Sequence, residues 1–220
     1  MRVSVKFATQ VVANSLIFGG VLLLSLTLWP VVSSEFSYWW GTQGWGKGTI
    51  GESATPGSLF GGLASAPSPL RVEPKSQDFG LVIEKIGVNA PVVEDVSVTD
   101  PQVYTEALRH GVAHARGTAT PGEVGNIYLF AHSSLNFWQL GEYATVFNLL
   151  RKLEGGDRVV LFYEGERFDF IVESKNIVSR FDLAPLLAET KRQLLTLQTC
   201  HPPGTTLNRL VVTASRQGGK

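Results

Sequence analysis

Cysteine is almost absent from this 220-residue sequence, which contains a single one, Cys200. One cysteine cannot form an intramolecular disulfide framework, and it excludes iron–sulfur and zinc sites that need several thiolates. The sequence also lacks net charge, because 19 Lys and Arg balance 19 Asp and Glu. Without a basic excess to neutralise phosphates, the chain is not expected to coat nucleic acid. It is nevertheless 44% hydrophobic and 10% aromatic, which excludes a wholly disordered protein.

Charge is missing altogether between Phe7 and Ser34. As a helix rising about 1.5 Å per residue, the apolar run at residues 11–32 is long enough to cross a bilayer. Positive residues precede the run and none follows closely, so residues 1–10 are predicted to be cytoplasmic and the rest extracytoplasmic. A cleaved signal peptide is the alternative, but the run is too long for one and an aromatic cluster follows it. We predict a single-pass signal-anchor helix in the cell membrane.

A change in composition divides the rest of the chain into two parts. Residues 33–77 are rich in Gly, Ser, Pro and Thr without sustained apolar periodicity, which predicts a flexible extracytoplasmic tether. Beyond Leu70 lie 33 of the 38 charged residues, as expected of a folded unit with a hydrated surface. Residues 78–220 are numerous enough to bury about two thirds of their surface around one core. We expect this unit to carry the function.

The pattern of this unit is mainly β. A continuous apolar stretch at residues 126–132 predicts a buried central strand, and Glu164-Gly165-Glu166 separates two strand-like runs as a hairpin turn. Further strands are expected at residues 79–86, 88–93, 158–163, 167–172, 193–200 and 207–214, and short helices at 101–108 and 182–189. About eight short strands with Gly-rich turns predict a closed or nearly closed β-barrel with short helices, preceded by one transmembrane helix.

The chemistry of the unit centres on Cys200, at the end of the strand predicted at 193–200. A lone cysteine is often a small buried hydrophobe. Outside the membrane, however, an unpaired thiol is open to oxidation, and this favours a reactive role. A cysteine nucleophile needs a proton acceptor or a cationic partner, because a thiol of pKa ~8.5 is only slightly ionised at neutral pH.

Four histidines are candidates for that partner. His201 neighbours the cysteine in an extended strand and therefore points to the opposite face. His110 and His114 have the i, i+4 spacing of a zinc pair, but the residues between them do not look helical and no acidic residue accompanies them. His132 ends the central strand, where catalytic groups commonly protrude, and a structural role fits that position equally well.

Arg209 lies on the last predicted strand. If residues 201–206 close the hairpin symmetrically, Arg209 pairs with Gln198, which shares a face with Cys200. The guanidinium would then lie diagonally across from the thiol, about 7–8 Å away at Cβ. From there it could donate hydrogen bonds to an oxyanion or a substrate carbonyl. A solvated surface arginine is the alternative.

Together these residues resemble the sortases, the membrane-anchored cysteine transpeptidases of bacterial surfaces. The segment Thr196-Leu197-Gln198-Thr199-Cys200 matches the TLxTC motif of that family, and Arg209 stands where the family's arginine follows on the next strand. Residues 125–132, with the sequence GNIYLFAH, are similar to the strand that ends in the catalytic histidine. The resemblance extends over residues 79–214 and implies a sortase-like barrel.

The resemblance also implies a reaction. Cys200 would attack the Thr–Gly carbonyl of an LPxTG-like C-terminal sorting signal, His132 would act as general acid and then as base, and Arg209 would stabilise the oxyanion. An amine acceptor of the cell wall or of another protein would resolve the thioester. The implied partners are sorting-signal-bearing surface proteins, this acceptor and, through the N-terminal helix, the membrane. No metal or other cofactor is expected, and calcium dependence is left open.

The resemblance further indicates where substrate binds. Thr199 is expected beside the nucleophile, in the substrate site. In the family, the connection before the cysteine strand walls the pocket for the first residues of the sorting signal. Here the helix predicted at 182–189 carries Leu186 and Leu187 on one side. Sealing one end of the barrel is the alternative role for these leucines.

Two other functions fit the same residues. A membrane-tethered thiol endopeptidase would resolve the thioester with water, and product analysis with and without an added amine distinguishes it. A non-catalytic β-barrel adaptor would use Cys200 only as a core residue, in which case the thiol should resist alkylation.

Overall fold

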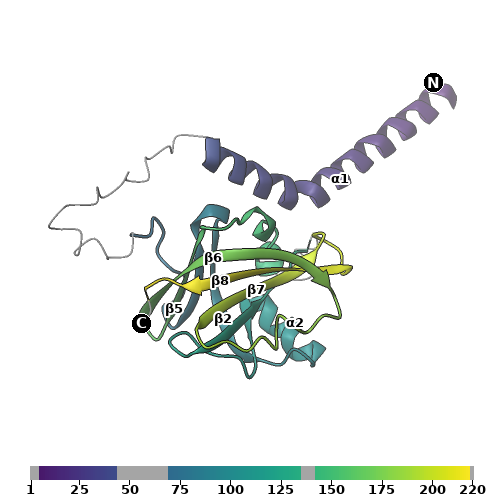
Figure 1. The fold of residues 1–220 in the computed structure, drawn as a ribbon. Helices are drawn as coiled ribbons and strands as arrows, with labels where there is room; N and C mark the ends of the chain where they lie inside the picture. Colours follow the sequence, from purple (N-terminus) through teal and green to yellow (C-terminus); the bar gives the residue numbers. More distant parts are fainter. Residues whose placement is uncertain (1–4, 44–68, 135–141, 219–220) are drawn as a thin grey trace.

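The computed structural model describes residues 5–43, 69–134 and 142–218. Eight β-strands close into a barrel in the order β1-β2-β3-β4-β7-β8-β6-β5, with β5 pairing back onto β1 (Figure 1). The strands are β1 Phe79–Ile83, β2 Val88–Val96, β3 Val112–Ala115, β4 Gly125–Phe130, β5 Arg158–Tyr163, β6 Glu166–Ser179, β7 Gln193–His201 and β8 Asn208–Arg216. The expected closed barrel of about eight strands is confirmed.

Two parallel pairs interrupt the otherwise antiparallel barrel. β2 runs parallel to β3, and the helix α2 (Pro101–His110) connects them. Asp100 caps this helix by accepting hydrogen bonds from two backbone N–H groups of the first turn, as the sequence indicates. β4 runs parallel to β7, which brings the strand before His132 alongside the strand that contains Cys200.

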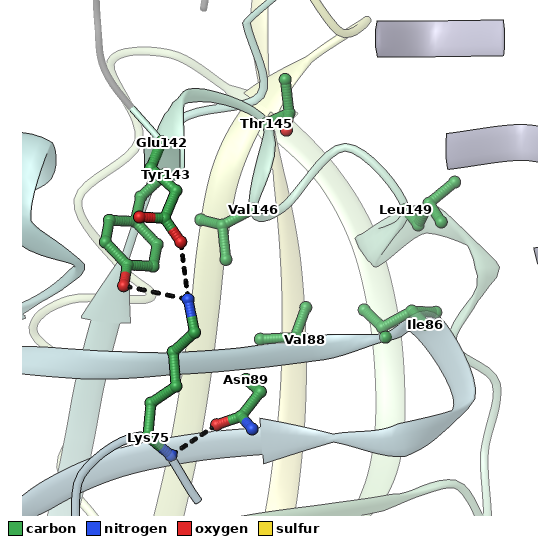
Figure 2. Close-up of a pocket in the computed structure, with 10 residues that line it drawn as sticks. Lys75, Ile86, Val88, Asn89, Glu142, Tyr143, Thr145, Val146 and Leu149 are labelled. Atoms are coloured by element: carbon green, nitrogen blue, oxygen red, sulfur yellow. Dashed lines mark hydrogen bonds and ion pairs between the residues drawn. The ribbon is translucent and has the colours of Figure 1, made fainter. Parts of the chain in front are cut away.

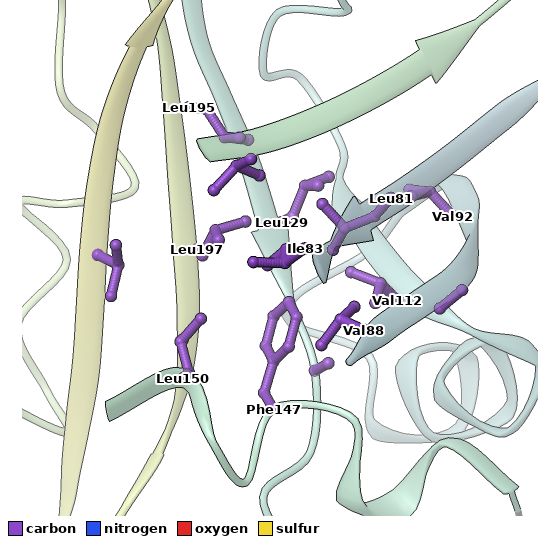
Figure 3. Close-up of a cluster of buried hydrophobic side chains, with 14 of the residues drawn as sticks. Leu81, Ile83, Val88, Val92, Val112, Leu129, Phe147, Leu150, Leu195 and Leu197 are labelled. Carbon is purple, nitrogen blue, oxygen red and sulfur yellow. The ribbon is translucent and has the colours of Figure 1, made fainter. Parts of the chain in front are cut away.

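The hydrophobic core fills the interior of the barrel. Alternate strand residues point inward, and Leu195 and Leu197 of β7 and Leu129 of β4 have no exposed surface. Phe147 and Leu150 join this cluster from the long β4–β5 connection (Figure 3). Truncating one such leucine to alanine typically costs about 2–5 kcal/mol, so the core gives the strands a stable frame.

Several elements differ from the expected ones. The sequence does not indicate β3, a strand of only four residues that pairs with β2 and β4. The first expected strand ends at Ile83 and continues as a 3₁₀ turn, η1 (Glu84–Ile86). Two similar turns, η2 (Glu142–Thr145) and η3 (Leu150–Lys152), lie in the β4–β5 connection.

The N-terminal helix α1 (Val5–Gln43) contains one stretch, Thr9–Leu26, that is long and apolar enough to cross a membrane. Apolar side chains such as Phe18 and Leu22 are more than half exposed, as expected of side chains that contact lipid. The helix bends along its length (Figure 1). An interior proline, Pro30, is the expected cause, because it removes a backbone hydrogen bond.

The helix continues past residue 32, where the sequence predicts its end, and this added part contacts the barrel. Glu35 forms ion pairs with Arg151 and with Lys152, the second at 3.4 Å. The Lys152 ammonium also lies 5.1 Å from the centroid of the Tyr38 ring, and Tyr38 packs against the core cluster. Most of the predicted tether, residues 44–68, lies outside the described residues.

Candidate active site

Cys200 and Arg209 lie directly opposite each other on β7 and β8. The strand pairing leaves residues 202–207 as the hairpin loop, which corrects the expected pairing of Arg209 with Gln198 by two residues. A two-residue shift keeps both side chains on one face, because the side-chain period of a strand is two. Directly opposed residues have Cβ atoms about 4.5–5.5 Å apart, so the two side chains start closer together than the sequence suggests. The Arg209 guanidinium donates a hydrogen bond to the Asn208 carbonyl oxygen at 3.2 Å.

His132 follows β4 by two residues and lies level with Cys200. β4 pairs with β7 at a constant offset, and the last pair is Phe130 opposite Gln198. Extending this offset by two residues puts His132 opposite Cys200. Hydrogen bonds continue the alignment beyond the strand, since the Ser133 hydroxyl donates to the Cys200 carbonyl oxygen at 2.6 Å. The alternation along β4 sends Ile127 and Leu129 into the core and therefore places His132 on the outer face with the thiol.

Cys200 thus lies between Arg209 on the neighbouring strand β8 and His132, which follows the neighbouring strand β4. The thiol is half-buried and unpaired, as the only cysteine must be. The outer face of the barrel carries all three side chains, so one bound group could contact them together. This arrangement offers a nucleophile, a proton carrier and a cationic hydrogen-bond donor side by side.

Burial controls the charge of the histidine. His132 is half-buried, and its Nε2 atom is inaccessible to solvent and has no hydrogen-bond partner among the described residues. Removing the imidazole from water disfavours its charged form, which lowers the pKa of His132 below the ordinary value. The lowered pKa favours the neutral ring, which can accept a proton.

A hydrogen-bonded pair of polar residues lies beside this row on the outer face. The buried Tyr128 of β4 donates a hydrogen bond to Gln198 Oε1, two residues before Cys200. Burial raises the pKa of Tyr128, so its hydroxyl stays protonated and keeps Gln198 in a fixed orientation. This pair was not among the residues expected from the sequence, although a tyrosine hydroxyl within a mainly apolar strand needs a hydrogen-bond partner.

Thr199 does not face the same side as the thiol. Its side chain is 3% exposed, and its hydroxyl donates to the Ala131 carbonyl oxygen at 2.8 Å. Thr199 therefore holds the segment that leads into His132, which corrects the expectation that it contacts substrate.

The prediction of a helix at residues 182–189 is wrong, because the segment forms only turns. Leu183 accepts hydrogen bonds from the N–H groups of Leu186 and Leu187, which closes a single turn. The Pro185 carbonyl then accepts a hydrogen bond from Asn126 of β4 at 2.9 Å instead of continuing a helix. The β6–β7 connection therefore lies against the outer face of β4, with Leu186 half-buried and Leu187 69% exposed.

The other histidines considered lie elsewhere. His114 is buried on β3, where its Nε2 atom contacts the Ala119 carbonyl oxygen at 3.0 Å. His110 ends α2 and is exposed. Within residues 5–43, 69–134 and 142–218, no three His, Cys, Asp or Glu side chains gather as a metal ion would require.

Known proteins match this chain over the barrel. A family model described as the sortase domain matches residues 81–217. Sortase D of Bacillus subtilis (strain 168) is 29% identical over 122 residues, which are 56% of this chain and 53% of that protein. The match thus spans about half the length of this relative.

Solved structures give the same result. Sortase C-1 from Actinomyces oris is 29% identical with a TM-score of 0.54, over 64% of this chain and 73% of that chain. Sortase A from Corynebacterium diphtheriae is 27% identical with a TM-score of 0.54, over 68% of this chain and 64% of that chain. Since the family model covers more than half of the sequence, including the strands that carry Cys200 and Arg209, the chain belongs to the sortase family.

Proposed function

We propose that this protein is a cysteine transpeptidase that cleaves an LPxTG-like sorting signal and transfers the protein to an amine. Family membership supports the reaction type. The assignment of residues is supported above all by the direct pairing of Cys200 with Arg209, with His132 two residues beyond the end of the adjoining strand β4. Cys200 is the nucleophile, His132 the proton carrier and Arg209 the oxyanion donor.

The first half-reaction forms a thioester. The neutral His132 imidazole takes the Cys200 proton while the sulfur attacks the carbonyl carbon of the Thr–Gly bond. The carbonyl oxygen becomes an oxyanion, which the Arg209 guanidinium stabilises through hydrogen bonds. When the C–N bond breaks, the imidazolium returns the proton to the departing amine. The lowered pKa of His132 favours this return, because a weakly basic imidazole releases its proton readily.

The second half-reaction reverses these roles. The nitrogen of an incoming amine attacks the thioester carbon, and His132 takes a proton from that nitrogen. The C–S bond then breaks, the new amide bond remains, and the thiolate regains the proton from the imidazolium. Hydrolysis would follow the same path with water as the attacking group.

The N-terminal helix supports a location of this chemistry at a membrane. With the helix spanning the bilayer and Arg2 and Lys6 on the cytoplasmic side, the barrel lies outside the cell. Its substrates are then surface proteins that carry a sorting signal, and its acceptor is an amine of the cell wall or of another protein.

Product analysis tests the proposal. The protein is incubated with a library of sorting-signal peptides, with and without a glycine-based amine, and the products are identified by mass spectrometry. We expect a new amide between the acyl fragment and the amine, and no product with Cys200→Ala. A hydrolysed product that the amine never replaces would identify a thiol endopeptidase instead.

A further inference from the structure

The segment before the first strand is bound to the barrel, although the sequence assigns it to the tether. The backbone N–H of Lys75 donates to Asn89 Oδ1 at 2.8 Å, and the Asn89 amide donates back to the Glu73 carbonyl oxygen at 2.7 Å. Further along, the Gln77 and Asp78 carbonyl oxygens accept hydrogen bonds from the β5–β6 turn. Residues 73–78 therefore lie in a fixed position beside β2 before the barrel begins.

The side chain of Lys75 extends from this fixed backbone to the η2 turn (Figure 2). Its ammonium lies 2.6 Å from Glu142 Oε1 and 3.3 Å from the Tyr143 hydroxyl, and 5.0 Å from the centroid of the Tyr143 ring. The hydrogen bond to Glu142 raises the pKa of Lys75, so the ammonium stays charged at any physiological pH. A carboxylate, a hydroxyl and an aromatic face thus hold one cation.

A cavity separates η2 from β2 beside this contact. Its volume is about 270 Å³, and apolar side chains from both sides, Val88 and Val146, line it together with Lys75 (Figure 2). Side chains of β2 and η2 do not pack closely across this space. The polar contacts of Lys75 connect the two elements instead. Loss of the ammonium would let η2 shift relative to β2.

Hydrogen bonds also connect the η2 turn and the residues after it to the segment that contains His132. The Ser134 N–H donates to the Ala144 carbonyl oxygen at 2.9 Å, and the Phe147 N–H donates to the His132 carbonyl oxygen at 3.2 Å. Residues 132–134 and 144–147 therefore form two legs of one connection. Ala144, which directly follows Glu142 and Tyr143, is thus hydrogen-bonded to the leg that contains His132.

We propose that Lys75 is a positioning residue for His132, acting through Glu142 and Tyr143 to hold the two legs of the β4–β5 connection in place. This inference rests on the proposed function for its catalytic consequence only. The mechanical link from Lys75 to residues 132–134 is independent of the reaction and can be measured in the absence of substrate.

The test uses the full-length protein in detergent micelles and two measurements. Lys75→Met should lower kcat by about two- to fivefold with KM unchanged, the range expected for the loss of a partly exposed ion pair. Without substrate, hydrogen exchange at the Ser134 and Phe147 amides should accelerate by a similar factor. Lys75→Arg, which keeps a cation near the carboxylate and the ring, should restore both values.

Matched controls separate positioning from general stability. Lys85→Met breaks another lysine–carboxylate pair, to Asp157 at 2.7 Å, that joins η1 to the start of β5, and it should change neither measurement. Glu142→Gln should reproduce Lys75→Met, and the double variant should not be additive, because both remove one contact.

Two results overturn the inference. Unchanged exchange at Ser134 and Phe147 in Lys75→Met shows that the contact does not hold the histidine leg. Faster exchange with unchanged kcat shows that the contact is structural only. A different result would refute only the proposed transpeptidase activity: the wild-type protein cleaves no sorting peptide, yet Lys75→Met still accelerates exchange. The mechanical link would then stand, so the two failures are distinguishable.

Discussion

Arg209 is the direct cross-strand partner of Cys200, which places the chain's only thiol and a guanidinium on one face of the barrel. The pairing follows from strand register and not from a loop, so backbone hydrogen bonds of two long strands fix the relative positions of the two residues. A donor held in this way needs little reorganisation when negative charge develops nearby, which is the property that an oxyanion site requires.

Replacing Arg209 tests this geometry. We expect Arg209→Lys to fold normally and to lose kcat by about 10²–10³-fold, because one ammonium cannot reproduce the planar donor fork. Arg216→Lys, on the same strand but bonded to Gln193 at the other end of β7, is the matched control and should retain activity. Turnover of Arg209→Lys near that of the control would show that another group stabilises the oxyanion.

The pH dependence of the reaction should report on His132. Burial lowers its pKa, so the imidazole loses its proton at a lower pH than an exposed histidine does. The acid limb of kcat/KM should therefore fall below about pH 6.5, the ordinary value for histidine. His132→Gln should abolish turnover. A limb at or above pH 6.5, or an active His132→Gln variant, would move the proton-carrying role to another group.

Truncation should reveal where the folded unit begins. A chain that starts at Leu70 keeps the contacts of residues 71–78 but loses the half-buried ion pairs of Glu35 and the packing of Tyr38, so its free energy of unfolding should fall by about 1–2 kcal/mol. A chain that starts at Ser76 also loses the hydrogen bonds of Lys75 to Asn89 and Glu142 and that of Asn89 to Glu73. It should be less stable than the chain that starts at Leu70 by about 1–3 kcal/mol. Equal denaturation midpoints for the two chains would show that the segment contributes nothing.

The leucines of the β6–β7 connection should influence specificity. Leu187 is 69% exposed beside the outer face of β4, so Leu187→Ala should leave the melting temperature nearly unchanged. We expect it to weaken the preference for an apolar first residue of the sorting signal by about 1–3 kcal/mol. Leu186→Ala, at the half-buried neighbour, should show a similar change with some loss of stability. The assay is kcat/KM across peptides varied at that position, and an unchanged profile in both variants would place the pocket elsewhere.

Part of this structure was predictable because it depends on local sequence. The period of two in a strand puts Gln198 and Cys200 on one face, so Arg209 stays on the correct face even though the expected register was two residues off. The capping of α2 by Asp100 follows from side-chain chemistry within one turn. The apolar run at residues 126–132 likewise identified β4, because a strand buried on both faces needs no alternation.

Other parts depend on contacts between distant residues. The leucine spacing at 182–189 suggests a helix, but a segment of eight residues is too short to be helical without packing, and Asn126 takes the Pro185 carbonyl. The role of Thr199 depends on the Ala131 carbonyl of another strand. The attachment of Lys75 to Glu142 joins residues 67 positions apart, and no local pattern marks either one.

The acyl-enzyme is the most direct test of the proposed chemistry. The protein is mixed with an LPxTG-like peptide without an amine, quenched in acid, and analysed by intact-protein and fragment mass spectrometry. We expect a mass increase equal to the peptide fragment that ends in threonine, located on Cys200 and released by hydroxylamine. No adduct during active cleavage, or an adduct on a residue other than Cys200, would contradict it.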